Sequence, residues 1–152
     1  MRKNILLLGV LTLLVLFSSN SNAQTPNFSG TWVLNMEKSK LDHPNEGLTS
    51  SIFVIKQVGD HFRLTIYHIY GEKKKRIRFK MNADGKTRSV KLIFKGRLEK
   101  TPTGLKSSLF RKNFSNVVDY SFGVNENEFV ADEVFKGLPR DHHSIWVFDK
   151  KL

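Results

Sequence analysis

Large apolar residues alternate with polar residues through most of the chain, with a period of two residues. The clearest case is Lys74–Met81, in which Ile77, Phe79 and Met81 share one face and basic residues share the other. Such alternation predicts β-strands that bury one face. Apolar residues after position 23 nowhere recur at helical spacing over three turns. The chain is therefore predicted to be all-β.

Short turn motifs separate the predicted strands, which number eight or nine. Gly59-Asp60 and Gly71-Glu72 are typical of hairpin turns. Gly96 and Thr101–Gly104 are expected to break the strand pattern between Lys95 and Leu105. Short connections favour antiparallel pairing of sequence neighbours, and closure into a barrel removes exposed edges. We predict an antiparallel up-and-down β-barrel, with an open sandwich as the alternative. The predicted strands are one within Asn27–Lys40, then Ser50–Val58, Phe62–Tyr70, Lys74–Met81, Ser89–Lys95, Leu105–Arg111, Val117–Val124, Glu128–Lys136 and Ser144–Asp149.

The first 23 residues have the pattern of a secretory signal peptide. Arg2 and Lys3 precede the apolar run Ile5–Phe17, and Ser21-Asn22-Ala23 provides the small residues that signal peptidase requires. The run is too short to span a bilayer comfortably. We expect cleavage after Ala23 and a single domain over residues 24–152.

Composition adds a compartment and a possible partner. The chain has no Cys, which for an exported domain favours a bacterial periplasm or surface, so the protein is predicted to be secreted or periplasmic. Two of the 25 basic residues and no acidic ones lie in residues 1–23, which leaves 23 against 14 and a formal charge of +9. Such a surface either attracts anionic lipid or glycan or simply keeps the protein soluble.

The opening Asn27–Trp32 resembles the Gly-x-Trp motif of the lipocalins and their calycin relatives, and it is similar to the Gly-Thr-Trp opening of avidin-type barrels. Val118-Asp119-Tyr120 resembles the later Thr-Asp-Tyr motif of lipocalins. The resemblance implies a lipocalin-like secreted bacterial β-barrel with Trp32 at its closed end. Avidin-type barrels line their biotin site with several Trp side chains. This chain has only two Trp residues, so the resemblance does not imply biotin binding.

If the basic residues of Lys74–Met81 face solvent, the opposite phase defines the interior. His68, Tyr70 and Tyr120 are then polar groups on an apolar wall, where they either satisfy one another or orient a ligand. Glu133 alternates with Ala131 and Phe135, although its apolar neighbours leave the phase of this strand open. The interior is either a filled core or a cavity for a small apolar or amphipathic molecule. The candidate lining residues are Trp32, Leu64, Ile66, His68, Tyr70, Phe79, Leu92, Phe94 and Tyr120.

A row of cations is the clearest surface feature. Lys74, Arg76, Arg78 and Lys80 share one face of a strand, about 6–7 Å apart. The row either contacts an anionic lipid or glycan surface or protects an exposed strand edge. Nucleic acid is not a predicted partner, because aromatic residues for base stacking are not interleaved on this face.

No residue pattern indicates catalysis or metal binding. His142 and His143 are adjacent and would point in opposite directions on an extended chain, and the chain has no Cys to complete a metal site. No serine lies in a nucleophile elbow. We therefore predict a non-enzymatic binding protein without cofactor or metal. An interaction module that uses the basic face is the alternative, and a barrel enzyme with an interior His and Tyr is a third hypothesis.

Overall fold

The computed structural model describes residues 26–42, 46–91 and 93–152. The predicted signal segment and Leu92 lie outside these residues. The described part of the chain contains ten β-strands and no helix, and so none that could span a membrane. The strands are β1 Gly30–Leu34, β2 Ser50–Val58, β3 His61–Tyr70, β4 Lys73–Asn82, β5 Arg88–Lys91, β6 Phe94–Thr101, β7 Gly104–Arg111, β8 Phe114–Phe122, β9 Glu128–Lys136 and β10 His142–Lys150.

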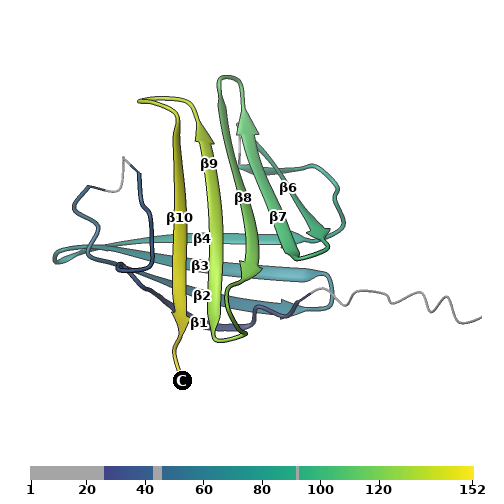
Figure 1. The fold of residues 1–152 in the computed structure, drawn as a ribbon. Coiled ribbons are helices and arrows are strands. Elements are labelled where there is room, and N and C mark those ends of the chain that lie inside the picture. The colour runs from purple at the N-terminus through teal and green to yellow at the C-terminus, as the bar shows by residue number, and fades with distance from the viewer. Residues whose placement is uncertain (1–25, 43–45, 92) are drawn as a thin grey trace, which may run out of the picture.

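All ten strands belong to one antiparallel sheet in the order β4-β3-β2-β1-β10-β9-β8-β7-β6-β5. Each strand pairs with its sequence neighbours except at β4 and β5, and β1 pairs with β10. In Figure 1, β2–β4 run across the view while β7–β10 lie close to vertical, alternately up and down, so the sheet curls into two layers whose strands cross. The all-β, antiparallel prediction is confirmed. The curl leaves one seam, between β4 and the β5–β6 hairpin.

The predicted count of eight or nine strands was wrong because β6 was missed. The predicted strand Ser89–Lys95 is divided between β5 and β6, and Gly96 lies inside β6 rather than ending a strand. A Cβ at Gly96 would collide with Val90 Cγ2 and lie 3.1 Å from Met81 Cε. Glycine therefore permits close approach here, which is its other common use within strands.

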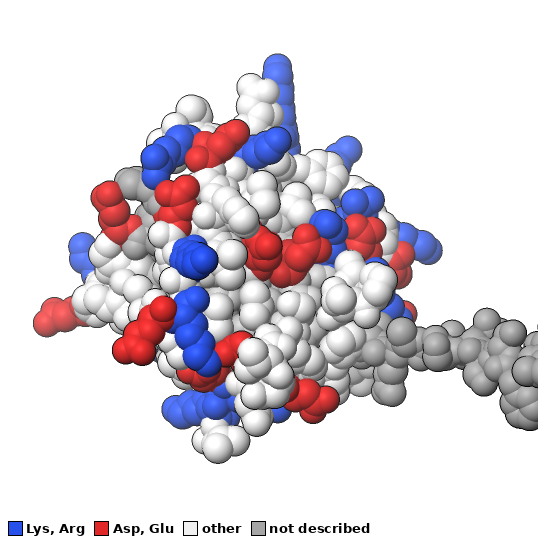
Figure 2. Space-filling model, in the orientation of Figure 1, with Lys and Arg blue, Asp and Glu red and all other residues white. Residues whose placement is uncertain are grey.

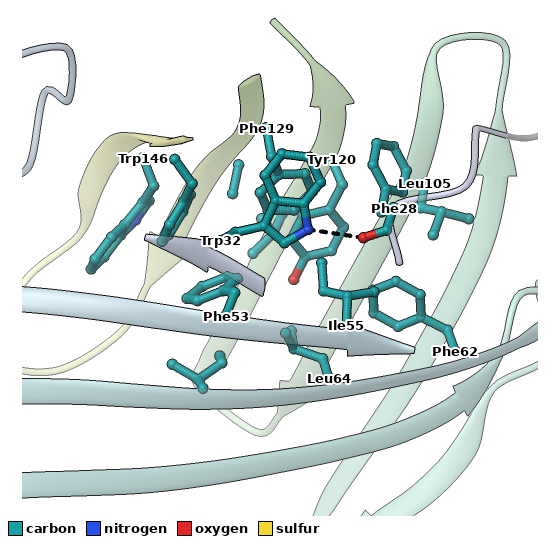
Figure 3. Packing of buried hydrophobic residues seen from close by; sticks show 14 of the residues in the cluster. Phe28, Trp32, Phe53, Ile55, Phe62, Leu64, Leu105, Tyr120, Phe129 and Trp146 are labelled. Atoms are coloured by element: carbon teal, nitrogen blue, oxygen red, sulfur yellow. Dashed lines mark hydrogen bonds between the residues drawn. The ribbon is translucent and has the colours of Figure 1, made fainter. Parts of the chain in front are cut away.

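A cluster of aromatic side chains fills part of the core between the two layers of the sheet. Phe28, Trp32, Phe129 and Phe148 are fully buried. The Phe129 ring lies 5.4 Å from the Trp32 ring and is stacked on that of Tyr120 at 5.7 Å (Figure 3). Trp32 Nε1 donates a hydrogen bond to the Phe28 carbonyl, so the indole is buried without an unsatisfied donor.

Candidate ligand-binding cavity

A cavity of about 200 Å³ lies between the two layers of the sheet. This volume is comparable to the apolar cavities of about 150 Å³ that take up benzene. The residues that line it come from β3, β4 and β6–β9. They are Phe62, Leu64, Ile66, His68, Ile77, Phe79, Met81, Leu98, Ser107, Ser108, Leu109, Phe114, Asn116, Tyr120 and Glu133.

One side of the cavity is an apolar wall made by β3 and β4. These strands pair with Leu64 opposite Phe79 and Ile66 opposite Ile77. Directly opposed residues on antiparallel strands point to the same face, so the period-two pattern of both strands builds one continuous surface. Leu64 and Ile66 are buried, and Phe79 is half-buried at the cavity.

The opposite side carries a polar group centred on Glu133 of β9. Asn116 Nδ2 donates a 2.5 Å hydrogen bond to Glu133 Oε1, and Trp146 Nε1 donates a 2.8 Å hydrogen bond to Glu133 Oε2. Asn116 and Trp146 lie on β8 and β10, the two strands that flank β9. The carboxylate is therefore held in place from both sides.

Tyr120 and Ser107 form a second polar contact on the lining. Ser107 Oγ donates to the Tyr120 hydroxyl oxygen at 3.4 Å. Burial raises the pKa of Tyr120 to about 12, against the effect of the Ser107 hydrogen bond, and the charge of Glu133 raises it further. Tyr120 consequently keeps its proton at neutral pH and can donate a hydrogen bond into the cavity.

His68 lies at the end of the apolar wall. Its Nδ1 is 3.1 Å from Ser51 Oγ, and its ring centroid is 5.7 Å from that of Trp146. Burial, and then the positive charge of Lys75, lower the pKa of His68 to about 4. The imidazole is therefore neutral at physiological pH.

The structure places five of the nine predicted lining residues at the cavity: Leu64, Ile66, His68, Phe79 and Tyr120. Trp32 is instead fully buried in the aromatic part of the core, and Tyr70 packs at the edge of the core with its ring 6.4 Å from His68. Phe94 packs against Phe114, with ring centroids 5.3 Å apart. Leu92 lies outside the described residues, so its prediction stands without a structural counterpart.

Asn116 and Ser107 line the cavity but are not among the predicted lining residues, and Glu133 also lines it, although its neighbours in the sequence do not fix the phase of its strand. The only sequence signal was period-two spacing: Asn116 is four residues before Tyr120, and Glu133 is two residues after Ala131. Such spacing gives the face of a strand but not the partner across the sheet.

Histidines 142 and 143 point to opposite faces, as their adjacency suggested. His142 is buried and stacks on Phe135 at 4.4 Å, whereas His143 is exposed and its Nε2 lies 2.6 Å from Asp132 Oδ1. Among the described residues, no three His, Cys, Asp or Glu side chains gather closely enough to hold a metal ion.

The basic row of β4 lies on the outer face of the sheet, and cations on β2 and β3 extend it. Lys56 is paired with Arg63, which in turn is paired with Lys80, so three cations lie side by side across three strands. A hollow of about 470 Å³ includes these three residues and Arg78. Lys74, Arg76, Arg78 and Lys80 are all exposed.

Few carboxylates balance this face. Residues 50–82 contain eight Lys or Arg and only two acids, Asp60 and Glu72, both located in turns. Within the described ranges, none of the cations Lys56, Arg63 and Lys80 has a carboxylate at salt-bridge distance; Asp60 pairs with Lys100 instead. Figure 2 shows the contrasting β8–β10 side, where acidic and basic side chains are interspersed.

Fold and cavity together define a class, an all-β protein whose single curled antiparallel sheet encloses an internal cavity, and solved structures of other proteins have a similar fold. An SAHS (secretory abundant heat soluble) protein of Ramazzottius varieornatus is similar with a TM-score of 0.59 at 15% identity, over 84% of this chain and 98% of that one. Zebrafish ileal bile acid-binding protein, crystallised with cholic acid, is similar with a TM-score of 0.56 at 16% identity. The match covers 82% of this chain and 98% of that one. Fatty-acid-binding protein 1 of Echinococcus granulosus has a TM-score of 0.56 at 15% identity, and the match covers 82% of this chain and 98% of that one.

At these identities the likeness concerns the fold alone. No protein-family model matches the chain, and no curated protein sequence matches it.

Proposed function

We propose that this chain is a non-enzymatic binding protein that holds a small lipophilic molecule inside its barrel. The observation that carries the proposal is the cavity of about 200 Å³, with an apolar wall and a few converging polar groups. This combination is typical of small-molecule sites, where apolar area supplies affinity and polar groups fix orientation. The bile acid-binding and fatty-acid-binding proteins of similar fold support the same class of function.

We also propose that the protein is exported. The motif of residues 1–23 supports this step, with cleavage after Ala23 leaving a mature chain that begins at Gln24. N-terminal sequencing or intact mass of the protein recovered from the periplasm or medium tests the step. A chain that retains residues 1–23 after export would contradict it.

Two substitutions on neighbouring residues of β3 test the cavity. Ile66 lines the cavity, whereas Thr65 lies on the outer face beside Arg78. Ile66→Trp should fill the cavity and weaken binding of an uncharged fluorescent naphthylamine probe, at a stability cost of roughly 1–3 kcal/mol from overpacking. Thr65→Trp adds the same side chain outside and should leave the titration unchanged. Wild-type protein that does not bind the probe would overturn the proposal.

We propose a second function, contact with an anionic lipid surface, on a separate observation. Lys56, Arg63 and Lys80 form a row across β2–β4, and the described carboxylates do not neutralise it. Cations near an anionic membrane surface are attracted to it, and each contributes about 1 kcal/mol.

Charge reversal on matched residues tests the second function. Arg63→Glu with Lys80→Glu should abolish sedimentation with phosphatidylserine-containing vesicles, while Lys112→Glu with Lys136→Glu makes the same change in net charge at other exposed positions. Binding should also weaken with added salt, because screening acts over about 8 Å at physiological ionic strength. Equal loss in both double variants would indicate non-specific charge attraction and would contradict a dedicated face.

A further inference from the structure

We propose that the cavity selects a ligand whose polar head is a hydrogen-bond donor, and a protonated amine above all, rather than a carboxylate. The inference rests on the proposed binding function and deepens it by assigning the chemical class of the ligand. It is carried by the charges and hydrogen bonds that face the cavity.

The cavity lining contains one carboxylic acid side chain and no Lys or Arg that could pair with it. Of its fifteen lining residues, Glu133 is the only Asp or Glu, and none is Lys or Arg. His68 also lines the cavity, but burial and Lys75 lower its pKa to about 4, so it adds no positive charge at neutral pH. A carboxylate ligand would therefore meet an acid and no counter-ion inside the barrel.

Glu133 is fixed in position but retains capacity for a further partner. Each of its two oxygens accepts one hydrogen bond, from Asn116 and from Trp146. A carboxylate has about four lone-pair sites, so one remains on each oxygen. Among the described residues, no Lys, Arg or His lies within salt-bridge distance of Glu133. An ammonium group of a ligand would supply the missing counter-ion.

The remaining polar groups fit the same head group. Tyr120 and Ser107 place two hydroxyls on the lining, and a hydroxyl oxygen can accept a hydrogen bond from an ammonium group. The apolar wall of Leu64, Ile66 and Phe79 lies across the cavity to receive a hydrocarbon tail. The two sides together describe a small lipophilic amine.

Three ligands with the same octyl tail test the inference: octylamine, octanol and nonanoic acid, each titrated as a competitor of the uncharged naphthylamine probe at neutral pH. The amine should displace the probe at the lowest concentration and the acid at the highest, with about tenfold between amine and alcohol, as expected for a hydrogen bond to a charged group. An acid that binds as tightly as the amine would overturn the inference while the cavity function stands. If the wild-type protein bound neither probe nor competitor, the proposed function itself would fail.

Substitution of the acid gives an independent test. Glu133→Gln removes the charge and keeps the shape, and it should reduce the amine–alcohol ratio to near unity. Glu126→Gln makes the same change in the exposed β8–β9 turn and should leave the ratio unchanged. An unchanged ratio in Glu133→Gln would contradict the inference. If that variant fails to fold, the ranking of the three ligands on wild-type protein decides the question alone.

Discussion

Trp32 Nε1 lies 2.9 Å from the Phe28 carbonyl oxygen, and the hydrogen bond ties the indole to the residue that precedes β1 by two positions. Both side chains are fully buried against Phe129. The opening Phe28–Trp32 segment is therefore held in the core as one packed unit.

Trp32 should be the most sensitive position of this unit. Trp32→Ala is expected to lower the free energy of unfolding by about 3–5 kcal/mol, because it deletes a large buried side chain. Trp32→Phe retains most of the packing but leaves the Phe28 carbonyl without this donor, at a cost of about 1–3 kcal/mol. Urea denaturation measures both, and a loss below about 1 kcal/mol in Trp32→Ala would contradict the assignment of Trp32 to the core.

Two strand glycines should differ in how much a methyl group costs. At Gly104 an added Cβ would collide with the Tyr120 carbonyl oxygen, which is backbone, whereas at Gly96 it meets the side-chain ends of Val90 and Met81. Side chains can move aside more easily than backbone. We expect Gly104→Ala to destabilise the protein more than Gly96→Ala, whose cost should be roughly 1–3 kcal/mol.

A double-mutant cycle checks the cause at Gly96. Val90→Ala removes the methyl groups that the new Cβ would meet, so it should restore part of the stability lost in Gly96→Ala. It should not rescue Gly104→Ala, which has no contact with Val90. Additive effects of Gly96→Ala and Val90→Ala would show that the assigned contact is not the source of the strain.

Stability should fall in mild acid because of His68. Its pKa is about 4 in the folded protein against 6.5 for the free side chain. Between these values the unfolded chain binds a proton at His68 that the native state does not. The contribution of His68 to stability is therefore complete above pH 6.5 and is lost as the pH falls toward 4. His68→Gln should flatten this part of the stability–pH profile, measured by urea denaturation at each pH, and an unchanged profile would contradict the assignment.

The sequence was most informative where burial is one-sided. On β3 and β4 strict alternation predicted both the strands and their inward residues, because a shift by one residue would expose the whole apolar set. β6 was harder, because a glycine inside a strand and a glycine ending one look alike until its neighbours across the sheet are known. The side chains of Met81 and Val90 explain why glycine is needed at position 96, and neither contact follows from the local sequence.

The candidate site divides in the same way. Leu64, Ile66 and Tyr120 follow from the phase of their own strands. The position of Glu133 depends on Asn116 and Trp146, which reach it from strands on either side. Trp32 and Phe94 share an inward phase with the lining residues but lie elsewhere along the barrel, because phase fixes a face and not a depth.

The seam beside β4 gives the two ends of the sheet a different exchange behaviour from its middle. β9 has partners on both sides, whereas β4 has a ladder only with β3. Half of the β4 amides therefore have no strand partner to protect them, and they should take up deuterium long before those of β9. A ligand in the cavity touches β4 through Ile77, Phe79 and Met81, so slower exchange of the protected β4 amides would report occupancy without any label on the ligand.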